Sequence, residues 1–567
     1  MTDTIRGISK RIVRREPVNP IDSDSPLLGR LFAARGLVSA GELDHSLKGL
    51  LPPDTLKDIS DAADIVCTAI EAEAAILVIG DFDADGATSC ALLVSALRAM
   101  GAGSVNYLVP DRFRFGYGLS PEIVQVAAEF GPELLITVDN GIASIEGVAL
   151  ANSLGIEVII TDHHLPGREL PAAAAIVNPN QPGCSFTSKN LAGVGVAFYL
   201  LSAVRSELRT RDWFSDRSEP NLADWLDLVA LGTVADVVQL DQNNRRLVQE
   251  GLRRIRAGRV RPGLNALIEI AGLDRSVLVT RDLAFSVAPR LNAAGRLQDM
   301  SLGIECLMAS DDRALELADQ LDALNRERQE IEANMRDQAM ELLKELSLEG
   351  KKAAGLCIYR DNWHEGVVGI IASRIKERAF RPVIAFAPVA GGELKGSGRS
   401  VAGFHLRDAL DAIATKHPGL LLRFGGHAMA AGLSLKETDF ERFSRAFDAE
   451  VTETLGDANL EQVVTTDGAL DEVIDLQTAR LLESAAPWGQ GLPEPEFDDD
   501  FEVLEQRLVG GRHLKLLLQP AQGLPVDAIC FNHPGLLESR HIHCAYRIEV
   551  NRFRGSEKPQ LVISLVV

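Results

Sequence analysis

Four short apolar runs, each followed by a longer segment of helical character, constrain the fold of this chain more than any other feature. The runs are Ala74–Ile79, Val105–Val109, Leu134–Val138 and Val158–Thr161. Their continuous hydrophobicity is typical of parallel strands that are covered on both faces. Helices are predicted between and after them, at about Thr88–Met100, Pro121–Phe130 and Ile145–Ser153. This alternation predicts a doubly wound α/β domain.

The chain has 567 residues and is too long for a single hydrophobic core. We predict an N-terminal helical extension over residues 1–70 and assign residues 71–310 to the first α/β domain. The latter range includes further predicted helices near Leu222–Leu231 and Arg245–Ile255. Residues 311–347 lack Gly and Pro and have helical apolar spacing. They predict a long helix that bridges two domains, with an ordinary surface helix as the alternative.

Two further domains are predicted after the long helix. A new α/β pattern begins at Ala353 with AAGLCIY and PVIAFAP, which predicts a second α/β domain over residues 348–455. Over residues 456–567 short apolar segments recur with turn residues between them: LKLLLQ, VDAICF, CAYRIEV and QLVISLV. Such a series predicts a small β-barrel.

The charge of the chain is distributed unevenly. The net charge is −22, and residues 437–505 alone hold 20 Asp and Glu against 3 Lys and Arg. Residues 506–567 hold 8 basic against 4 acidic residues. Affinity for phosphate depends on the local potential, so the acidity argues against a protein that coats DNA but not against a confined basic groove.

The composition also indicates the cellular compartment of the protein. No apolar run approaches the roughly 20 residues of a membrane span, and no apolar segment follows the basic residues near the start. Seven scattered cysteines without a CxxC pair indicate neither a disulfide framework nor a zinc site. We therefore expect a cytoplasmic protein without a membrane partner.

Acidic residues and histidines follow the predicted strands. The first strand ends in Asp81-Phe82-Asp83-Ala84-Asp85-Gly86, the third in Asp139-Asn140-Gly141 and the fourth in Asp162-His163-His164. Asp236 lies farther on, inside the apolar run ALGTVADVV. Ligands of open α/β sheets bind at the carboxyl ends of the strands, so three of these clusters converge on one crevice.

Each cluster has a structural alternative when it is taken alone. Asp85 could cap the helix that follows it, a single histidine could be scaffolding, and Asp236 could be a buried core carboxylate. Together, however, several carboxylates at neighbouring strand ends would repel one another and be costly to desolvate without cations. Oxygen ligands with few imidazoles suit Mg²⁺ or Mn²⁺ better than zinc. Two such ions are the usual device for hydrolysing phosphate esters, so this chemistry is predicted.

The motifs resemble those of the DHH phosphoesterases, and among these the RecJ family of single-strand-specific 5′→3′ exonucleases. Four segments correspond to the motifs of the DHH class: DFDADG (81–86), TVDNG (137–141), DHH (162–164) and LGTVAD (231–236). The likeness continues through VPDRFRFGYGLS (109–120), AGVGVAF (192–198), PRLNAAGR (289–296), NRERQ (325–329), WHEGVVGI (363–370), KGSGRS (395–400) and GGHAMAAG (425–432). It covers nearly the whole chain.

The resemblance implies roles for individual residues. The metal ligands would be Asp81, Asp83, Asp85, Asp139, His163 and Asp236, holding two Mg²⁺ or Mn²⁺ ions. Asp139 would bridge the ions, and His164 would contact the scissile phosphate, so that Asp139, His163 and His164 form the catalytic group. Contacts to nucleic acid and its 5′-phosphate would come from Arg112, Arg296, Ser397, Arg399 and His427. A guanidinium fork matches phosphate oxygens, and a closed pocket would make digestion start at an end.

The predicted barrel resembles the OB-fold of the family, a fold that commonly binds single strands. Basic residues could line its strand-tracking face, although such residues are usually a solvated surface: Arg507, Arg512, Lys515, Arg547, Arg552 and Arg554. The segment PWGQGLPEPEF (487–497) departs from the family pattern at Leu492, where Asn is common. The implied partners are single-stranded DNA, a single-stranded-DNA-binding protein and a RecQ-type helicase in repair and recombination, with the enzyme acting as a monomer.

Other functions remain open from the sequence. A DHH phosphodiesterase or phosphatase that acts on short oligonucleotides would share the strand-end motifs, but such proteins are shorter and lack the barrel. A DNA-binding scaffold that has lost catalysis would lack metal ligands, and an inorganic pyrophosphatase would lack the nucleic-acid motifs. The sequence does not determine the preferred ion, the ligands of each ion, processivity, activity on RNA or the repair pathway.

Overall fold

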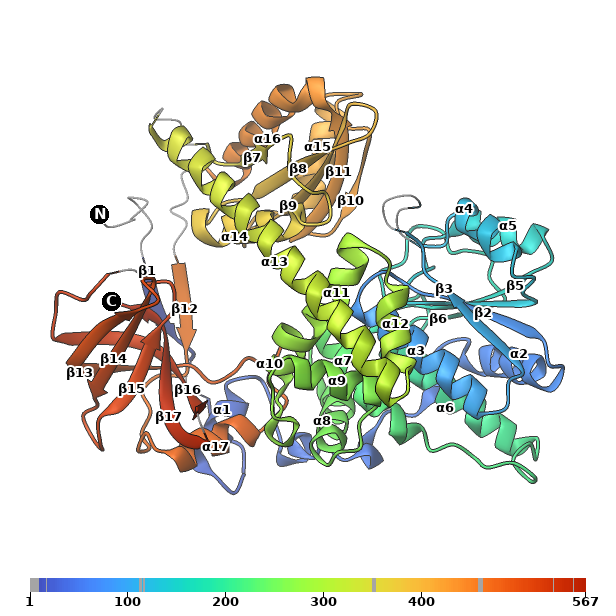
Figure 1. Cartoon of the computed structure of the whole chain (residues 1–567), viewed down its shortest axis with the longest axis horizontal. Helices are drawn as coiled ribbons and strands as arrows, with labels where there is room; N and C mark the ends of the chain where they lie inside the picture. Colours follow the sequence, from blue (N-terminus) through green and yellow to red (C-terminus); the bar gives the residue numbers. More distant parts are fainter. Residues whose placement is uncertain are drawn as a thin grey trace.

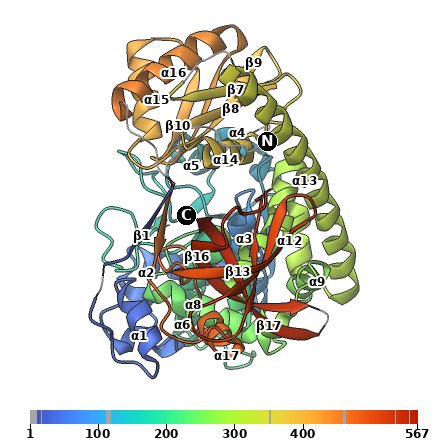
Figure 2. The ribbon, with the colours of Figure 1, turned by 90° about the vertical axis from the view of Figure 1, so that its left-hand side faces the viewer.

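The computed structural model describes residues 10–16, 18–111, 115, 118–348, 353–456, 462–533, 535–553 and 555–567. Three bodies are visible in Figure 1: a domain with a parallel sheet at the right, a second α/β domain at the top and a barrel at the left. Helices of the first domain lie between its sheet and the barrel. Figure 2, turned by 90°, shows the barrel in front of these helices.

Five parallel strands form the first sheet, in the order β3-β2-β4-β5-β6. Their bounds are β2 (Ala75–Ile79), β3 (Ser104–Leu108), β4 (Leu134–Val138), β5 (Glu157–Thr161) and β6 (Ala175–Val177). The four predicted strands are confirmed. The edge strand β6 was not predicted, because three residues are too few to show a hydrophobic pattern.

Helices cover both faces of this sheet. One face carries α2 (Ile59–Glu71), α3 (Ala84–Ala99) and α6 (Gly193–Thr210), and the other carries α4 (Pro121–Ala128) and α5 (Ile145–Ser153). Successive side chains of a strand point to opposite faces, so Val78 packs in one hydrophobic cluster and its neighbour Leu77 in the other. The doubly wound prediction is confirmed.

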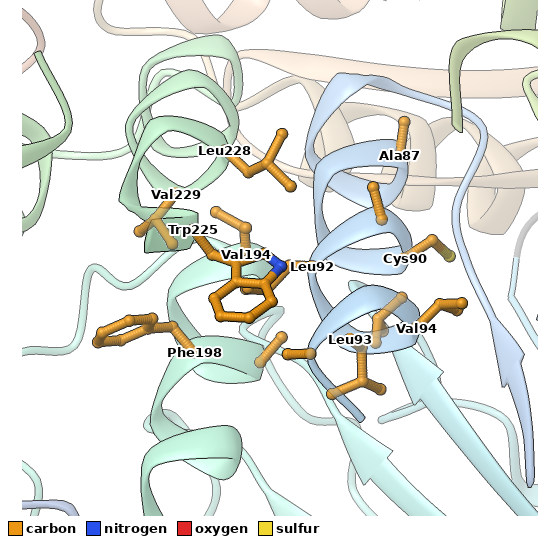
Figure 3. Close-up of a cluster of buried hydrophobic side chains, with 14 of the residues drawn as sticks. Ala87, Cys90, Leu92, Leu93, Val94, Val194, Phe198, Trp225, Leu228 and Val229 are labelled. Atoms are coloured by element: carbon orange, nitrogen blue, oxygen red, sulfur yellow. The ribbon is translucent and has the colours of Figure 1, made fainter. Parts of the chain in front are cut away.

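Further helices extend the first core away from the sheet. They are α7 (Leu226–Ala235), α8 (Gln242–Arg256), α9 (Pro262–Ile270), α10 (Thr280–Asp282), the π-helical turn η6 (Leu283–Val287), α11 (Ala288–Leu297) and α12 (Ser301–Met308). Figure 3 shows Trp225, just before α7, among apolar side chains that include Leu92 of α3 and Phe198 of α6. Its indole Nε1 donates a hydrogen bond of 2.6 Å to Oγ of Ser95.

The predicted bridging helix is α13 (Asp311–Leu348). Leu317 and Leu321 in its first half pack in the core of the first domain, whereas Met335 and Ala339 pack in the core of the second. The alternative of an ordinary surface helix is therefore wrong. Figure 1 shows the helix running from one domain to the other.

The second α/β domain is built on a mixed sheet of order β10-β11-β9-β8-β7. Its strands are β7 (Leu356–Tyr359), β8 (Val383–Val389), β9 (Glu393–Arg399), β10 (Arg423–Gly426) and β11 (Ala430–Lys436). Its helices are α14 (Val368–Ala379), α15 (Leu406–Lys416) and α16 (Phe440–Leu455). Aromatic side chains dominate the core under this sheet, with Phe386, Phe443 and Phe447 all fully buried.

The C-terminal region forms the predicted barrel, which is closed in the order β13-β14-β15-β17-β16. The strands are β13 (Phe497–Val509), β14 (His513–Gln519), β15 (Val526–Cys530), β16 (His541–Phe553) and β17 (Ser556–Val566), and α17 (Leu476–Ser484) packs against β16 and β17. The departure at position 492 is accommodated by packing, because Leu492 is buried against Phe32 and Trp488. None of the described helices is long and apolar enough to cross a membrane.

The prediction of a helical extension over residues 1–70 needs correction. Its first described residues form β1 (Lys10–Arg14), which pairs in parallel with β12 (Gln462–Thr466) beside the barrel. The helix α1 (Pro26–Ala33) places Leu27 and Leu31 in the core of the barrel, and only the later residues, with α2, pack on the first domain. The sequence did not reveal this strand, because its pairing partner lies about 450 residues away.

Candidate metal centre and cleft

The predicted metal ligands lie at the ends of three adjacent strands and one helix. Asp81 follows β2 after one residue, Asp139 follows β4 directly, and His163 comes two residues after β5. Asp236 is the C-cap residue of α7, not part of a strand. The strand ends share one edge of the sheet, and α7 reaches them by packing against α3.

Seven side chains meet there in three overlapping groups of potential ligands. These groups are Asp81, Asp83 and Asp139; Asp85, His163 and Asp236; and Asp139, His163 and His164. Within each group one ligand atom per residue lies within 4.8 Å of the others. Nε2 of His163 is 3.1 Å from Oδ1 of Asp139 and 3.4 Å from Oδ2 of Asp236. Because Asp139 and His163 each belong to two groups, the arrangement suits two neighbouring ions.

Asp139 sits in an unusual backbone conformation. Its φ is 61°, in the left-handed region that only Asn, Asp and Gly adopt readily. A Cβ added to Gly193 would come within 2.6 Å of Cβ of Asp139, so a glycine is required at the start of α6. The next residue, Asn140, is buried and donates its side-chain amide to the carbonyl groups of Ile79 and Val138. The end of β4 and the start of α6 together fix the position of Asp139 at the edge of the sheet.

Asp85 has a second function beside the one predicted for it. Its two oxygens accept hydrogen bonds from the backbone N–H groups of Gly193 and Val194, at 2.6 and 2.9 Å. The carboxylate thus anchors the N-terminus of α6 to α3, and its position within the second ligand group depends on that anchor. The N-cap of α3 is Asp83, which accepts from the N–H groups of Asp85 and Gly86.

Asp162 is a residue whose role the sequence reasoning did not assign. Its Oδ1 accepts from Nδ1 of His164 at 2.7 Å and from the N–H groups of both histidines, and Oδ2 accepts from the N–H of Ile142. It is 1% exposed and fixes the orientation of the His164 ring. The sequence offered one signal for this role, because Asp162 is the first residue of the DHH triplet. Buried carboxylates commonly orient functional histidines in this way.

The electrostatics of the cluster favour cations. Burial, followed by the neighbouring carboxylates, raises the pKa of Asp139 far above its usual range, and burial with Asp85 and Asp83 raises that of Asp236 to about 9. Burial lowers the pKa of His163 to about 4, which leaves the neutral imidazole that metals bind. Nε2 of His163 and Oδ2 of Asp236 are buried without a hydrogen bond in the described structure. The residues present therefore fit divalent cations.

His164 differs from its neighbour. Burial alone would lower its pKa, but the hydrogen bond to Asp162 and the nearby carboxylates raise the pKa to about 9. The hydrogen bond from His164, together with the N–H of Ile142, keeps the pKa of Asp162 below its ordinary value despite burial. The ring is about one-third exposed and carries a positive charge at neutral pH, which suits the phosphate contact predicted for it.

The loop after β2 that carries Asp81 and Asp83 is here called the metal-site loop. A cleft of about 640 Å³ separates it from the second domain. It is lined by Phe82 and Asp83 from one side, Asn292 and Arg296 from α11, and β9, β10, β11 and the start of α14 from the other. Ser397 and Arg399, two of the residues for which a phosphate contact is predicted, lie in its wall. Nη1 of Arg399 donates to Oγ of Ser397 at 3.1 Å and to the carbonyl of Gly398 at 2.8 Å.

Arg399 is suited to bind an anion. Burial lowers its pKa, and among the described residues no carboxylate lies within ion-pair distance of its guanidinium. Gly369 leaves room for it, since a Cβ there would lie 3.1 Å from Nη2 of Arg399. The predicted partner Arg296 lines the same cleft and donates to the carbonyl of Gly366 at 3.2 Å.

The other predicted contacts are placed less clearly. His427 is exposed in the turn between β10 and β11, and it does not line the cleft. Arg112 lies outside the described residues. The cleft wall also contains residues to which the sequence reasoning gave no role, among them Phe82, Asn292, Glu365, Lys395 and Arg423. Asn292 accepts a hydrogen bond of 2.8 Å from the N–H of Ala84 and so joins α11 to the metal-site loop.

The basic residues of the barrel do not form one open face. Arg547 pairs with Glu494 at 3.3 Å, and Arg552 pairs with Glu483 at 2.6 Å, so both hold the barrel to its neighbours. Lys515 lies 3.3 Å from Asp527. Of the six predicted residues, Arg507 and Arg512 are exposed without an ion pair in the described structure, while Arg554 lies outside it.

Fold and site together define a metal-dependent phosphoesterase of the DHH class. Residues 75–233 match the DHH family N-terminal domain, residues 350–453 the DHHA1 domain and residues 466–564 the RecJ OB domain. The single-stranded-DNA-specific exonuclease RecJ of Dickeya dadantii is 55% identical over 552 residues, which cover 96% of each chain. The RecJ protein of Escherichia coli is 53% identical over 95% of each chain. The chain therefore belongs to the RecJ family.

Solved structures agree with this assignment. The crystal structure of RecJ from Thermus thermophilus in complex with Mn²⁺ superposes with a TM-score of 0.80 and 30% sequence identity, covering 100% of this chain and 80% of that chain. A second crystal structure, of exonuclease RecJ bound to manganese, is 36% identical and covers 71% of this chain and 96% of its own, with a TM-score of 0.59. The fold is thus shared over the full described length.

Proposed function

We propose that this protein is an exonuclease that hydrolyses phosphodiester bonds of single-stranded DNA from the 5′ end to mononucleotides, with two Mg²⁺ or Mn²⁺ ions. The observation that carries the proposal is the buried set of overlapping ligand groups beside a cleft with arginines in its wall. Relatives named as single-stranded-DNA-specific exonucleases, and RecJ structures with Mn²⁺ or Mg²⁺, support the substrate and the ions.

The residues of the chain have separable tasks. One ion would be held by Asp81, Asp83 and Asp139, and the other by Asp139 with His163 and Asp236, near Asp85. When bound, the ions supply an activated water and neutralise charge on the phosphoryl group. His164, held by Asp162, presents a charged Nε2 side to the scissile phosphate. Its proton remains on the ring, because Asp162 stabilises the charged form.

The 5′ polarity rests on the cleft wall. Arg399, Ser397 and Arg296 offer donors to a terminal phosphate, with Arg112 as the fourth residue assigned from the family motif. A terminal phosphate carries more negative charge than an internal one, so the arginines favour the end of a strand. Capture there would place the first phosphodiester bond at the ions.

The broader setting of the enzyme is proposed on the same basis. We expect a monomer in the cytoplasm that works on single strands exposed by a RecQ-type helicase or covered by a single-stranded-DNA-binding protein, in repair and recombination. The complete ligand set argues against an inactive scaffold, and the closed barrel argues against an enzyme limited to very short oligonucleotides.

End-labelled oligonucleotides provide the test. Single-stranded and blunt duplex substrates, labelled at either end, are incubated with Mg²⁺, Mn²⁺ or EDTA. We expect early release of a 5′ label as mononucleotide from the single strand, slow attack on the duplex and no product in EDTA. Release of the 3′ label before the 5′ label would contradict the polarity, and equal rates on both substrates would contradict the strand preference.

A further inference from the structure

Two glycines in the cleft wall are not explained by the protein itself. A Cβ added to Gly425 would meet nothing within 4 Å, and one added to Gly432 would meet only a backbone oxygen at 4.0 Å. Neither has a positive φ, so the backbone does not demand glycine at either position. Most cleft-lining glycines differ, because Gly396 is packed against the Phe386 ring and Gly369 against Ser397. Interior strand glycines cost stability, so their presence points to a close approach from outside the chain.

The strand register places these glycines in one row with a predicted phosphate contact. Gly425 of β10 is opposite Gly432 of β11, which is opposite Ser397 of β9. Residues that are directly opposite share a face of the sheet, and Ser397 faces the cleft. The row therefore forms a strip of the sheet surface, here called the lane, that spans two strand spacings, or about 10 Å. Apart from the Ser397 hydroxyl, the lane exposes only backbone.

Basic residues flank the lane on both sides. The row on one side contains Arg399, opposite Ala430, and the row on the other contains Lys395, Ser434 and Arg423. Each row is two residues, or about 7 Å, from the lane. Lys395 and Arg423 also line the cleft; Nζ of Lys395 is 2.7 Å from Glu365, and Arg423 is largely exposed, 3.8 Å from Glu393. The surface of the sheet thus carries a basic row, then the lane with little side chain, and then a second basic row.

We propose that the row Ser397–Gly432–Gly425 is the surface on which the terminal nucleoside of the DNA strand lies, between its 5′-phosphate at Arg399 and the scissile phosphate. The scissile phosphate would meet the ions on the side of Asp83 and would meet Lys395 and Arg423 on the side of the sheet. This inference rests on the proposed exonuclease function, and it adds the position of the nucleoside and a second phosphate contact. A backbone floor without side chains makes no base-specific hydrogen bond, so it accepts any base. The sequence tolerance that an exonuclease needs follows from it.

Valine substitutions at Gly425 and Gly432 test whether these glycines contact DNA or only support the fold. Because both sites are open and lie in strands, Gly425→Val and Gly432→Val should leave the melting temperature unchanged or raise it. Inserted methyl groups in a close contact should weaken binding of a 5′-phosphorylated single-stranded decanucleotide by about 5- to 150-fold, with alanine weakening it less. Binding is measured by fluorescence anisotropy in the Asp139→Asn background, and hydrolysis in the otherwise native enzyme. Gly535→Val, at another open glycine on the barrel, is the matched control.

The second phosphate contact has its own readout. Loss of one lysine–phosphate contact to a single strand should reduce the slope of log Kd against log salt concentration by about 0.7. We expect this change for Lys395→Gln and not for Lys416→Gln, on helix α15, which packs against the opposite face of the same sheet. An unchanged slope for Lys395→Gln would refute the second phosphate contact.

The outcomes distinguish the lane from the proposed function. Undiminished binding and hydrolysis in both valine variants would overturn the lane while leaving the exonuclease intact. Valine-sensitive binding in a protein whose native form hydrolyses no DNA would support the lane and overturn the exonuclease.

Discussion

At the scale of single residues, the metal centre is a set of carboxylates that the fold keeps close together against their mutual repulsion. The raised pKa values of Asp139 and Asp236 express that repulsion together with the desolvation of both groups. Backbone geometry contributes as well, since Asp139 holds a left-handed conformation against Gly193. Such local costs are typical of functional sites and are offset by the surrounding structure.

Asp139→Asn is the substitution that tests the centre most directly. Asn tolerates a left-handed φ almost as well as Asp, whereas Ala would add backbone strain to the loss of the ligand. Hydrolysis should fall by several orders of magnitude, because the ligand proposed to be shared by both ions loses its charge.

Thermal stability gives an independent measure of the same variant. Without divalent ions, Asp139→Asn should melt no lower than the native protein, because one buried repulsive carboxylate is gone. Saturating Mn²⁺, at about 100 times its dissociation constant, should stabilise the native protein by about 2.7 kcal/mol and the variant by much less. An equal rise in melting temperature for both proteins would refute the assignment of Asp139.

Arg399→Ala tests capture of the 5′ end. An arginine at this position could instead form an ion pair within its own domain, but no such pair is present in the described structure. A lost charge-assisted hydrogen bond is worth roughly 1.5–3 kcal/mol, so kcat/KM should fall about 10- to 150-fold on a 5′-phosphorylated strand. The effect should be much smaller on a 5′-hydroxyl strand. A similar loss on both strands with a lowered melting temperature would indicate a structural role instead.

The positions of the proposed strand-end ligands were predictable from the sequence, because Asp81, Asp139 and His163 each follow an apolar run. The contacts between distant segments were not. Asn292 contacts the metal-site loop from more than 200 residues away in the sequence. The need for glycine at position 193 follows only from its close approach to Asp139 in the folded chain. Likewise, the barrel arginines 547 and 552 form ion pairs with Glu494 and Glu483, which lie far from them in the sequence.

At the scale of elements, α13 sets the geometry between the two halves of the cleft. Its first half is fixed in the core of the first domain and its second half in that of the second. Between them, Arg328 pairs with Glu332 at 2.8 Å, and Glu332 also lies 3.1 Å from Arg374 of α14. The helix was predictable from its composition and spacing, whereas β1 and β6 were not, since short edge strands leave little pattern in the sequence.

Insertion of one alanine after Glu327 tests this element. One extra residue rotates everything beyond it by about 100° and moves it by about 1.5 Å along the axis. Ser397 and Arg399 would then no longer face the metal ligands, so exonuclease activity should be lost. The rise in melting temperature with Mn²⁺ should persist, because all metal ligands lie in the first domain. The substitution Glu327→Ala, at the same exposed position, should retain activity, and an active insertion variant would show that α13 does not fix the cleft.

At the scale of the whole molecule, the two ends of the chain form one unit. Arg14 pairs with the buried Asp498 at 2.6 Å, and Arg15 and Arg35 both pair with the buried Asp467. The basic residues near the start of the chain thus neutralise part of the acidic stretch 437–505, whose charge looked unfavourable for a nuclease. Prediction from the sequence treated the two ends separately, because no local pattern records which distant charges pair.

Arg35 is the residue on which this unit most depends. Its side chain is 1% exposed, lies over the ring of Trp488 at 5.4 Å and pairs with Asp467 at 2.8 Å. Arg35→Leu would leave a buried carboxylate with only Arg15 as an ionic partner, so unfolding of the barrel should become easier by about 3–5 kcal/mol. The double variant Arg35→Leu, Asp467→Asn should recover part of this loss, because the uncompensated charge is then absent. Denaturant titration measures the stability of each protein.

The same variant separates the barrel from the catalytic centre. At temperatures where the barrel is unfolded, Arg35→Leu should still hydrolyse short oligonucleotides, because the ligands and the cleft lie in the two α/β domains. Its KM for long single strands should rise, since the barrel would no longer bind the strand beyond the cleft. Loss of activity on both lengths in parallel would mean that the barrel is needed for the fold of the centre itself. Unchanged KM for both would mean that the strand does not bind the barrel.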